Sequence, residues 1–140
     1  MRVEQVSTRP LHEKLGVRAG QRVSVLGRFG AEFLATLDRH GVDGFRRPRR
    51  ASDLIFLLAR SLADLERIAA LEPYLVDNGA LWVVSRKGRE ATMRDVDVIA
   101  AAKRAGLVDN KVVSFSDTHT ALRLVIPVVR RKGRGRPDDG

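Results

Sequence analysis

The chain has 140 residues, 44% of them hydrophobic and 31% charged, and Lys plus Arg outnumber Asp plus Glu by 26 to 17. This indicates one globular domain and excludes a disordered chain. The absence of cysteine excludes disulfides, thiolate metal sites and a cysteine nucleophile. The longest apolar run, residues 54–59, falls short of the roughly 20 residues that a membrane helix needs. No signal-peptide pattern is visible, so we expect a cytoplasmic location.

The first part of the chain predicts a helix, a strand, a helix and a second strand. The apolar spacing of residues 11–17 predicts a short helix that ends near Gly16. Residues 22–26 (R-V-S-V-L) predict the first strand, because β-branched and apolar residues dominate a run that glycines bound. A helix is expected over residues 31–40. Residues 42–46 predict a weak second strand, closed by an Arg-Pro-Arg run.

The middle of the chain predicts strands that are covered on both faces. The run 54–59 is apolar throughout, as expected for a strand inside a parallel sheet. A helix follows, which Pro73 must kink or restart, and Asn78-Gly79 is expected to end that segment in a turn. Residues 80–84 (A-L-W-V-V) then predict another buried strand.

The next helix is expected over residues 93–105, with Thr92 as its cap. Its apolar spacing predicts that three side chains face inward: Val96, Ile99 and Ala100.

The end of the chain changes character. Two β-rich runs, 111–115 and 121–129, are joined by a connection short enough for an antiparallel hairpin. Strands that alternate with helices imply an α/β, Rossmann-like, mostly parallel sheet, here of about six strands with a C-terminal hairpin. We therefore expect a flexible N-terminus over residues 1–10, one domain over 11–129 and a disordered basic tail over 130–140.

Positive charge gathers in two stretches. One surrounds Pro48 and the other is the tail, and we take four residues of the first and five of the second as candidate cations: Arg46, Arg47, Arg49, Arg50, Arg130, Arg131, Lys132, Arg134 and Arg136. Such a field favours an anionic partner, which is a phosphorylated ligand, a nucleic acid or an acidic protein. Alternatively, the charges only keep the domain in solution. The tail has no apolar residues to pair with its charges, so we expect no membrane binding.

In a parallel α/β sheet, ligands bind beyond the carboxyl ends of the strands. There the first strand is followed by Gly27-Arg28-Phe29-Gly30, whose glycines allow either a close ligand approach or simply a tight turn. This is G-x-x-G rather than G-x-G-x-x-G, and Phe29 puts a bulky ring where a dinucleotide loop keeps a glycine. Only a weak cofactor pattern is therefore present.

The second strand ends in Arg46 and Arg47 rather than in a carboxylate. Guanidinium groups cannot accept hydrogen bonds from a ribose but can grip phosphate or carboxylate in a bidentate way. Arg86 and Lys87 follow the strand at 80–84, at the rim where a cleft would open, although loop cations are often only solvated. The candidate anion-binding residues are Gly27, Arg28, Gly30, Arg46, Arg47, Arg86 and Lys87, and the nucleic-acid candidates are Arg49, Arg50 and the tail cations.

Other chemistry has weaker support. The three histidines are far apart in sequence, and none has a partner at metal-ligand spacing. Asp117 and His119 share the final turn and could form an acid–base pair, but two such residues in a turn are common without catalysis. We assign no catalytic residue.

The order of motifs resembles a shortened class I methyltransferase. Residues 11–27 (L-x-x-x-L-G-V-x-x-G-x-R-V-S-V-L-G) resemble that family's entry helix and first strand, and residues 53–61 (D-L-I-F-L-L-A-R-S) its fourth strand. L-V-D-N-G-A-L-W-V-V (75–84) resembles the next turn and strand, and residues 105–127 the terminal hairpin. Residues 10–130 more closely resemble a bacterial family of small proteins, the domain of unknown function three thousand and fifty-two.

The chain departs from the methyltransferase pattern at the positions that bind S-adenosylmethionine. Val25 stands where the family has an acidic residue, Phe29 stands at the second loop glycine, and no carboxylate closes the second strand. The stretch 46–53 is too short for the family's extra helix and strand. We therefore expect a domain without a cofactor and without methyl transfer that binds an anionic partner. The alternatives are a small enzyme that uses S-adenosylmethionine or a nucleotide, and a nucleic-acid-associated basic protein.

Overall fold

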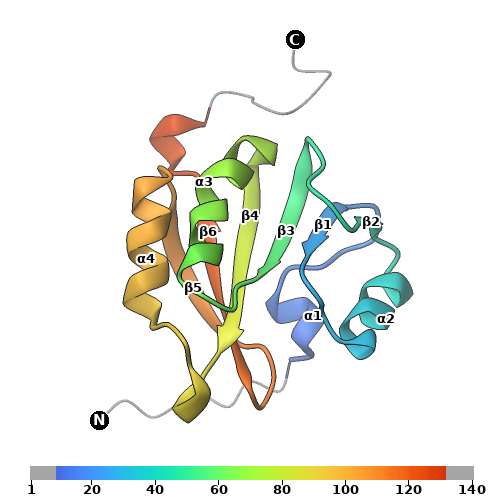
Figure 1. Ribbon diagram of the computed structural model, residues 1–140. Coiled ribbons are helices and arrows are strands. Elements are labelled where there is room, and N and C mark those ends of the chain that lie inside the picture. The colour runs from blue at the N-terminus through green and yellow to red at the C-terminus, as the bar shows by residue number, and fades with distance from the viewer. Residues whose placement is uncertain (1–8, 132–140) are drawn as a thin grey trace.

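The computed structural model describes residues 9–131, which form one six-stranded sheet with helices on both faces (Figure 1). The α-helices and strands are α1 (Leu11–Lys14), β1 (Arg22–Leu26), α2 (Ala31–Arg39), β2 (Asp43–Phe45), β3 (Ser52–Leu58), α3 (Arg67–Leu71), β4 (Leu75–Arg86), α4 (Asp95–Arg104), β5 (Val108–Ser114) and β6 (His119–Val125). Short 3-10 turns cover Ala63–Glu66, Glu72–Tyr74, Gly88–Glu90 and Val128–Arg130. No helix in the described part of the chain could cross a membrane.

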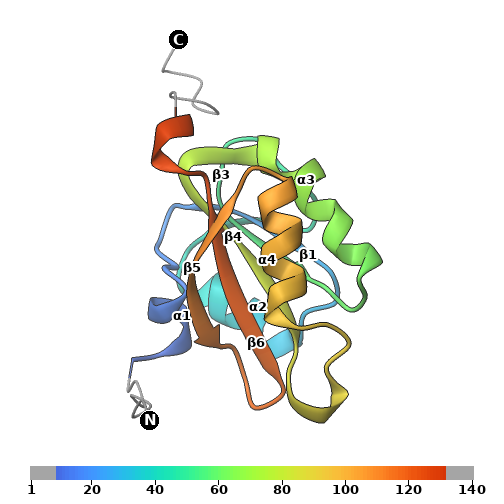
Figure 2. The same ribbon diagram turned by 90° about the vertical axis from the view of Figure 1, so that its left-hand side faces the viewer.

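The strand order is β2-β1-β3-β4-β6-β5, in which the first four strands are parallel and β6 is antiparallel to both of its neighbours. This confirms the expected α/β, Rossmann-like sheet with a C-terminal hairpin. The helices α1 and α2 cover one face, and α3 and α4 cover the other (Figure 2). The alternation along β1 sends Val23 and Val25 to the first face and Leu26 to the second.

The expected elements are present with shifted ends. The strand predicted from 80 to 84 begins at Leu75 and continues through the expected turn at Asn78-Gly79. Glycine is needed there because the backbone of β3 passes so close that a Cβ on Gly79 would lie 2.9 Å from the Asp53 carbonyl oxygen. Gly79 therefore marks a close strand approach rather than a turn. The last strand ends at Val125 and not at residue 129, since Pro127 cannot donate to a ladder.

The inward face predicted for α4 is wrong in part. Val96 (58% exposed) and Ala100 face solvent, and Ile99 is partly buried, while Val98 and the two alanines 101 and 102 carry the buried face. The helix begins two residues later than expected, because the carboxylate of Asp97 accepts a hydrogen bond from the Arg94 backbone N–H (2.8 Å) and caps it there. Thr92 instead donates its hydroxyl to the Arg60 carbonyl (2.8 Å).

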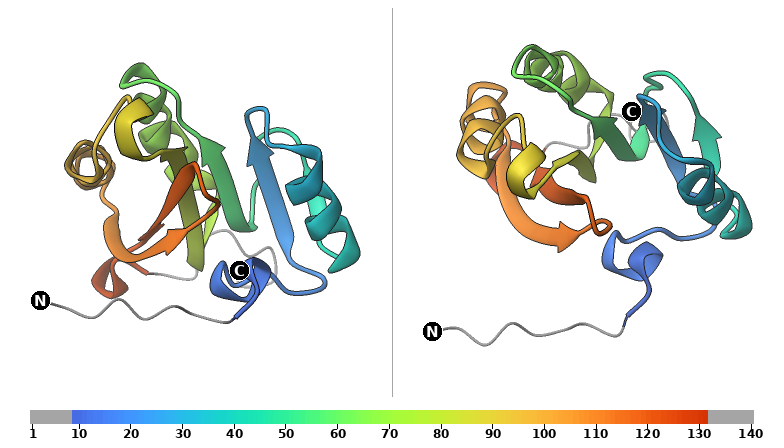
Figure 3. Two further views of the ribbon diagram at one scale, coloured as in Figure 1. Left: turned by 90° about the horizontal axis from the view of Figure 1, so that it is seen from below. Right: turned by 60° about the horizontal axis from the view of Figure 1, so that its bottom comes forward.

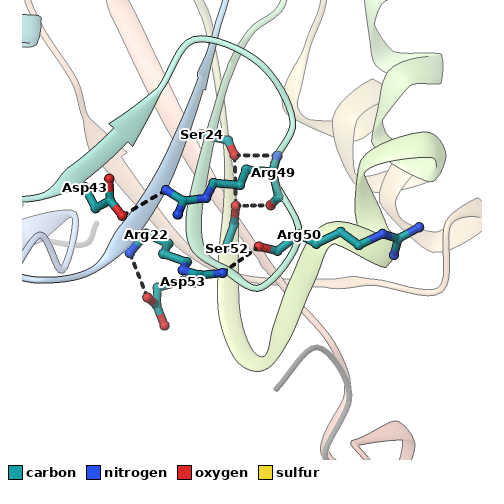
Figure 4. A network of polar contacts seen from close by, with 7 residues as sticks. All are labelled: Arg22, Ser24, Asp43, Arg49, Arg50, Ser52 and Asp53. Carbon is teal, nitrogen blue, oxygen red and sulfur yellow. Dashed lines mark hydrogen bonds and ion pairs between the residues drawn. The ribbon is translucent and has the colours of Figure 1, made fainter. Parts of the chain in front are cut away.

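The connection from β2 to β3 is short for parallel strands, which usually need a dozen or more residues. Here residues 46–51, the crossing segment, pass over β1 on the α3 face (Figure 4). The Arg49 N–H donates to the Ser24 hydroxyl (3.2 Å), and the Ser52 hydroxyl donates to the Arg49 carbonyl. Because the single Ser52 proton is used there, Ser24 must donate to Ser52 (2.8 Å), which closes a ring of three bonds.

The crossing segment ends in a residue with a left-handed backbone. Ala51 has φ of +61° and is the one non-glycine residue with positive φ between residues 9 and 131. Side chains disfavour this region by about 1–2 kcal/mol. The tight path into β3 therefore imposes a local cost that the serine ring offsets.

Both sheet edges are short or irregular. β2 has three residues, and β5 carries an irregularity between Asp109 and Lys111. The Lys111 ammonium leaves the sheet plane to donate to the Lys14 carbonyl at the end of α1 (3.0 Å). This contact ties the first helix to the last hairpin.

Replacing Ala51 with glycine should leave the free energy of unfolding unchanged or raise it by about 0.5 kcal/mol, because relief of the positive φ outweighs the chain entropy of glycine. The matched change Ala70→Gly, at an exposed position of α3, should lower it by about 0.5–1 kcal/mol. Urea denaturation of the two variants measures both values. A larger loss for Ala51→Gly than for Ala70→Gly would contradict the strain.

Candidate functional site

The carboxyl ends of the parallel strands meet at one edge of the sheet, which Figure 3 shows from below. The β1–α2 loop, the residues after β3 and β4 and the β5–β6 turn all lie there. This is the edge at which ligands bind in open α/β sheets. The residues at these four places therefore make up the candidate site.

The two loop glycines have different roles. Gly27 has φ of +111°, and a Cβ on it would lie 2.8 Å from the Cβ of Leu58 on the neighbouring strand. Packing against β3 thus explains this glycine without a ligand. Gly30 has an ordinary φ of −65° as the residue before α2, and nothing lies within 4 Å of the place of its missing Cβ. Open space therefore adjoins Gly30.

The ring of Phe29 does not stand over the loop. It is 8% exposed and packs on the α2 side of the sheet, with its centroid 5.1 Å from that of Phe33 and 5.9 Å from that of Phe115. The ring nevertheless lines the aromatic cavity together with Gly30, so it remains at this edge of the sheet. The chain before α2 turns the side chain into the core, where aromatic partners bury it.

Arg46 does reach the loop. Its guanidinium donates to the Gly27 carbonyl (3.3 Å), so a fixed positive charge lies across the end of β1. Its neighbour Arg47 is exposed, and its side chain makes no hydrogen bond or ion pair within residues 9–131.

A cavity of about 490 Å³, which we call the aromatic cavity, opens between α1, α2 and the β5–β6 turn. Aromatic and aliphatic side chains form much of its wall, and polar or charged groups stand around them: Leu11, Phe29, Phe33, Leu58, Val84, Phe115, His12, Arg28, Glu32, Thr36, Arg39, Ser116 and His119. Its volume falls in the range of small-molecule sites.

A second cavity of about 340 Å³ lies beside the ends of β3 and β4, and we call it the arginine cavity. It is lined by Leu58, Ala59, Arg60, Arg86, Thr92 and His119. Leu58 and His119 border both cavities. The two spaces therefore adjoin at the His119 side chain.

Burial, and then the positive charges of Arg86 and Lys87, lower the pKa of His119 below its usual value of 6.5. Its Nδ1 lies 2.7 Å from the hydroxyl oxygen of Thr118, which fixes the ring. No ion pair between Asp117 and His119 occurs within the described residues. The structure thus gives no support for the acid–base pair considered from the sequence.

The two cations after β4 point to different places. Arg86 lines the arginine cavity and makes an exposed ion pair with Glu90 (3.3 Å). The Lys87 ammonium donates to the Ser114 hydroxyl (2.8 Å), which holds it against the hairpin. Arg86 is therefore the residue of the pair that lines the arginine cavity, while both residues line a more open hollow of about 470 Å³ before α4.

Arg49 and Arg50 do not belong to this edge. The crossing segment carries them to the opposite edge of the sheet, where the parallel strands begin (Figure 4). There Arg49 pairs with Asp43 (2.9 Å) and lies over the Phe45 ring (3.8 Å), while Arg50 lies over the ring of Tyr74 (5.2 Å). These two nucleic-acid candidates therefore lie apart from Arg46 and Arg86, because the chain must return to the first residue of β3, Ser52.

The basic tail begins later than expected. Arg130 donates to the Gly106 carbonyl and pairs with Glu72 (3.2 Å), and Arg131 donates to the Ile126 carbonyl (2.9 Å). Both are therefore bound to the domain rather than part of a free tail. Lys132, Arg134 and Arg136 lie outside the described residues.

Sequence reasoning missed Arg60, and it named His119 only for another role. Arg60 directly follows the buried run 54–59, so the rule that ligands bind at carboxyl strand ends would have found it. Phe115 and Arg39 had no such indication, since only the fold brings the hairpin turn beside α2.

No family model matches the sequence, and no curated protein matches it. Solved structures do match. A TehB-like S-adenosylmethionine-dependent methyltransferase from Corynebacterium glutamicum is 12% identical, with a TM-score of 0.61 over 83% of this chain and 85% of the other. The calicheamicin-biosynthesis methyltransferase CalO1, bound to S-adenosylhomocysteine, is 14% identical, with a TM-score of 0.63 over 83% and 52%. An O-methyltransferase family protein from Burkholderia thailandensis is 13% identical, with a TM-score of 0.57 over 76% and 51%. The chain has a methyltransferase-like fold.

The fold implies S-adenosylmethionine, but the residues at the corresponding edge do not fit it. The Arg46 guanidinium lies beside Gly27 and cannot accept a hydrogen bond from a ribose hydroxyl. Leu58 packs against the Cα of Gly27, and Val25 offers no carboxylate near the end of β1. We derive no methyl-transfer step from this site. No cluster of three or more metal-ligating side chains occurs in residues 9–131.

Gly27→Ala should lower the free energy of unfolding by about 2 kcal/mol or more, because both the positive φ and the contact with Leu58 oppose a Cβ. Gly30→Ala is the matched control and should change it by less than about 0.5 kcal/mol. Thermal or urea unfolding compares the two. Equal effects would show that Gly27 is not kept by packing.

Proposed function

We propose that this domain binds a small anionic ligand at the carboxyl edge of its sheet and transfers no methyl group. The observation that carries the proposal is the arginine cavity, in which Arg60, Arg86 and His119 come together from three different segments. Guanidinium and imidazole groups around a space of ligand size are the donors that phosphate and carboxylate need.

The charge around His119 supports the same conclusion. Its lowered pKa reflects a positive potential from Arg86 and Lys87 in addition to burial. The positive potential of these two side chains attracts an anion beside the ring, although burial disfavours any charge there. Arg60 lines the same cavity, and the carboxylate of Glu90 offsets part of the charge at Arg86.

Binding of nucleic acid is less well supported. The described cations proposed for it, Arg49, Arg50, Arg130 and Arg131, lie toward the edge where the parallel strands begin, and all four make contacts within the domain. These contacts compete with the phosphate contacts that a nucleic acid would need.

From the motifs of residues 10–130 alone, we also propose membership of the bacterial domain-of-unknown-function family three thousand and fifty-two.

Titration with inorganic phosphate tests the proposal. Arg60→Gln and Arg86→Gln should each weaken binding about ten-fold, because each removes a charged donor from the cavity. Arg50→Gln, at the opposite edge, is the control and should leave the affinity unchanged. Calorimetry or amide chemical shifts report the affinities. The proposal fails if phosphate does not bind or if all three variants bind it equally.

The same titration with S-adenosylmethionine in place of phosphate tests the alternative that the domain is a small enzyme that uses this cofactor. We expect no binding, because Arg46 lies across the loop and neither β1 nor β2 ends in a carboxylate that could accept from the ribose hydroxyls. A micromolar dissociation constant would overturn the absence of a cofactor.

Sulfate, whose charge does not change in this range, should bind more tightly as the pH falls toward the lowered pKa of His119, because an anion in the cavity stabilises the imidazolium form and so raises that pKa. In the absence of ligand the sign is reversed. The folded state disfavours the imidazolium, so the contribution of His119 to stability is complete above pH 6.5 and is lost as the pH falls through its lowered pKa. His119→Gln keeps a donor and removes both dependences, which titrations and urea melts at several pH values measure.

A further inference from the structure

The aromatic cavity and the arginine cavity share a boundary, since the side chains of Leu58 and His119 line both. A ligand held by His119 can therefore extend into either space. The chemistry of the two sides decides which part of a ligand each would take.

On one side of His119 the wall is aromatic. Phe115 lies with its ring centroid 5.0 Å from that of Phe33, and Phe29 lies 5.1 Å from Phe33 and is tilted against it. Leu11 of α1 and Leu58 of β3 extend this apolar surface. Such a wall binds a flat apolar body, which gains from area removed from water and from ring-to-ring contact.

Cations stand on the other side. Arg60 and Arg86 line the arginine cavity and no carboxylate does. Arg28 and Arg39 also border the aromatic cavity, but Glu32 stands in the same wall and Arg39 already donates to the Thr36 hydroxyl (3.2 Å). The wall that has arginines and no carboxylate thus lies beyond His119, away from the rings, although Glu90 outside this wall pairs with Arg86 (3.3 Å).

His119 is oriented for a ligand at the junction. The Thr118 hydroxyl and His119 Nδ1 share a hydrogen bond (2.7 Å), and in the tautomer in which the hydroxyl donates, the neutral ring carries its proton on Nε2. In that tautomer Nε2 is a donor that can point to a ligand. An anion between His119 and the two arginines would accept from it.

We propose that the two cavities form one site for a small aromatic anion, with its ring among Phe29, Phe33 and Phe115 and its carboxylate or phosphate between His119, Arg60 and Arg86. This rests on the proposed function and specifies its ligand class. The combined space accommodates a ring and an attached anionic group.

Two phosphate esters of equal charge test the proposal on the full chain. Phenyl phosphate should bind at least about ten-fold more tightly than methyl phosphate, because the ring buries apolar area in the aromatic cavity. Arg60→Gln should weaken both esters by a similar factor. Benzoate compared with acetate distinguishes a carboxylate ligand from a phosphate ligand.

Filling the aromatic cavity should remove the advantage of the ring. Gly30 borders this cavity and has open space at its missing Cβ, so Gly30→Leu should bring the two esters to equal affinity. Ala70→Leu adds the same side chain to an exposed position of α3 and should keep the ten-fold difference. Phe115→Leu, which removes a half-buried ring with little change in volume, gives a second measurement if Gly30→Leu does not fold.

The outcomes are separable. If phenyl and methyl phosphate bind the unaltered chain equally, the aromatic ligand class is wrong and the proposed function remains. If neither ester nor inorganic phosphate binds, both fall. A ten-fold advantage that survives Gly30→Leu and Phe115→Leu places the ring elsewhere and overturns the assignment.

Discussion

The ring of hydrogen bonds that joins Arg49, Ser24 and Ser52 is the constraint on which the rest of this fold depends. A backbone that crosses the buried face of a sheet must find partners for its own N–H and C=O groups. Two fully buried serines, one on each strand beneath the crossing, supply both partners at a single residue. Six residues can thereby replace the helix that normally covers such a connection.

This short crossing also determines the electrostatics of the two sheet edges. It leaves Arg46 at the carboxyl edge, where its guanidinium binds the Gly27 carbonyl, and delivers Arg49 and Arg50 to the amino edge. The carboxyl edge consequently has a methyltransferase-like backbone with arginine side chains around it. In the function that we propose, an anion would find there the donors that it needs.

Much of the fold could be predicted because the local pattern and the packing agree. β1 has the expected bounds, since its alternating residues fit the two apolar layers on either side. Prediction was wrong where tertiary contacts decided. Gly79 belongs to an Asn-Gly pair typical of turns, but it lies where β4 passes close to β3. Val96 fits the apolar face of the predicted helix, but α4 begins at Asp95, where Asp97 caps it, and Val96 is exposed.

The candidate site was predictable only in outline. The rule for carboxyl strand ends placed Arg86 correctly, but chain order could not reveal that the crossing segment reverses direction before Arg49. Nor could it show that the β5–β6 turn brings His119 and Phe115 beside residues of α1, α2 and the end of β3, since such contacts arise only from strand order.

The irregular outer strands have a consequence for how these molecules behave when crowded together. A sheet left open at both sides offers unpaired backbone to any neighbouring copy, which is how strand-to-strand aggregation starts. In this fold β2 is too short to act as a template, and the irregularity beside Lys111 distorts the edge strand β5 where it pairs with β6 and places a charge there. The same features that make the sheet look incomplete thus protect it from polymerising through its edges.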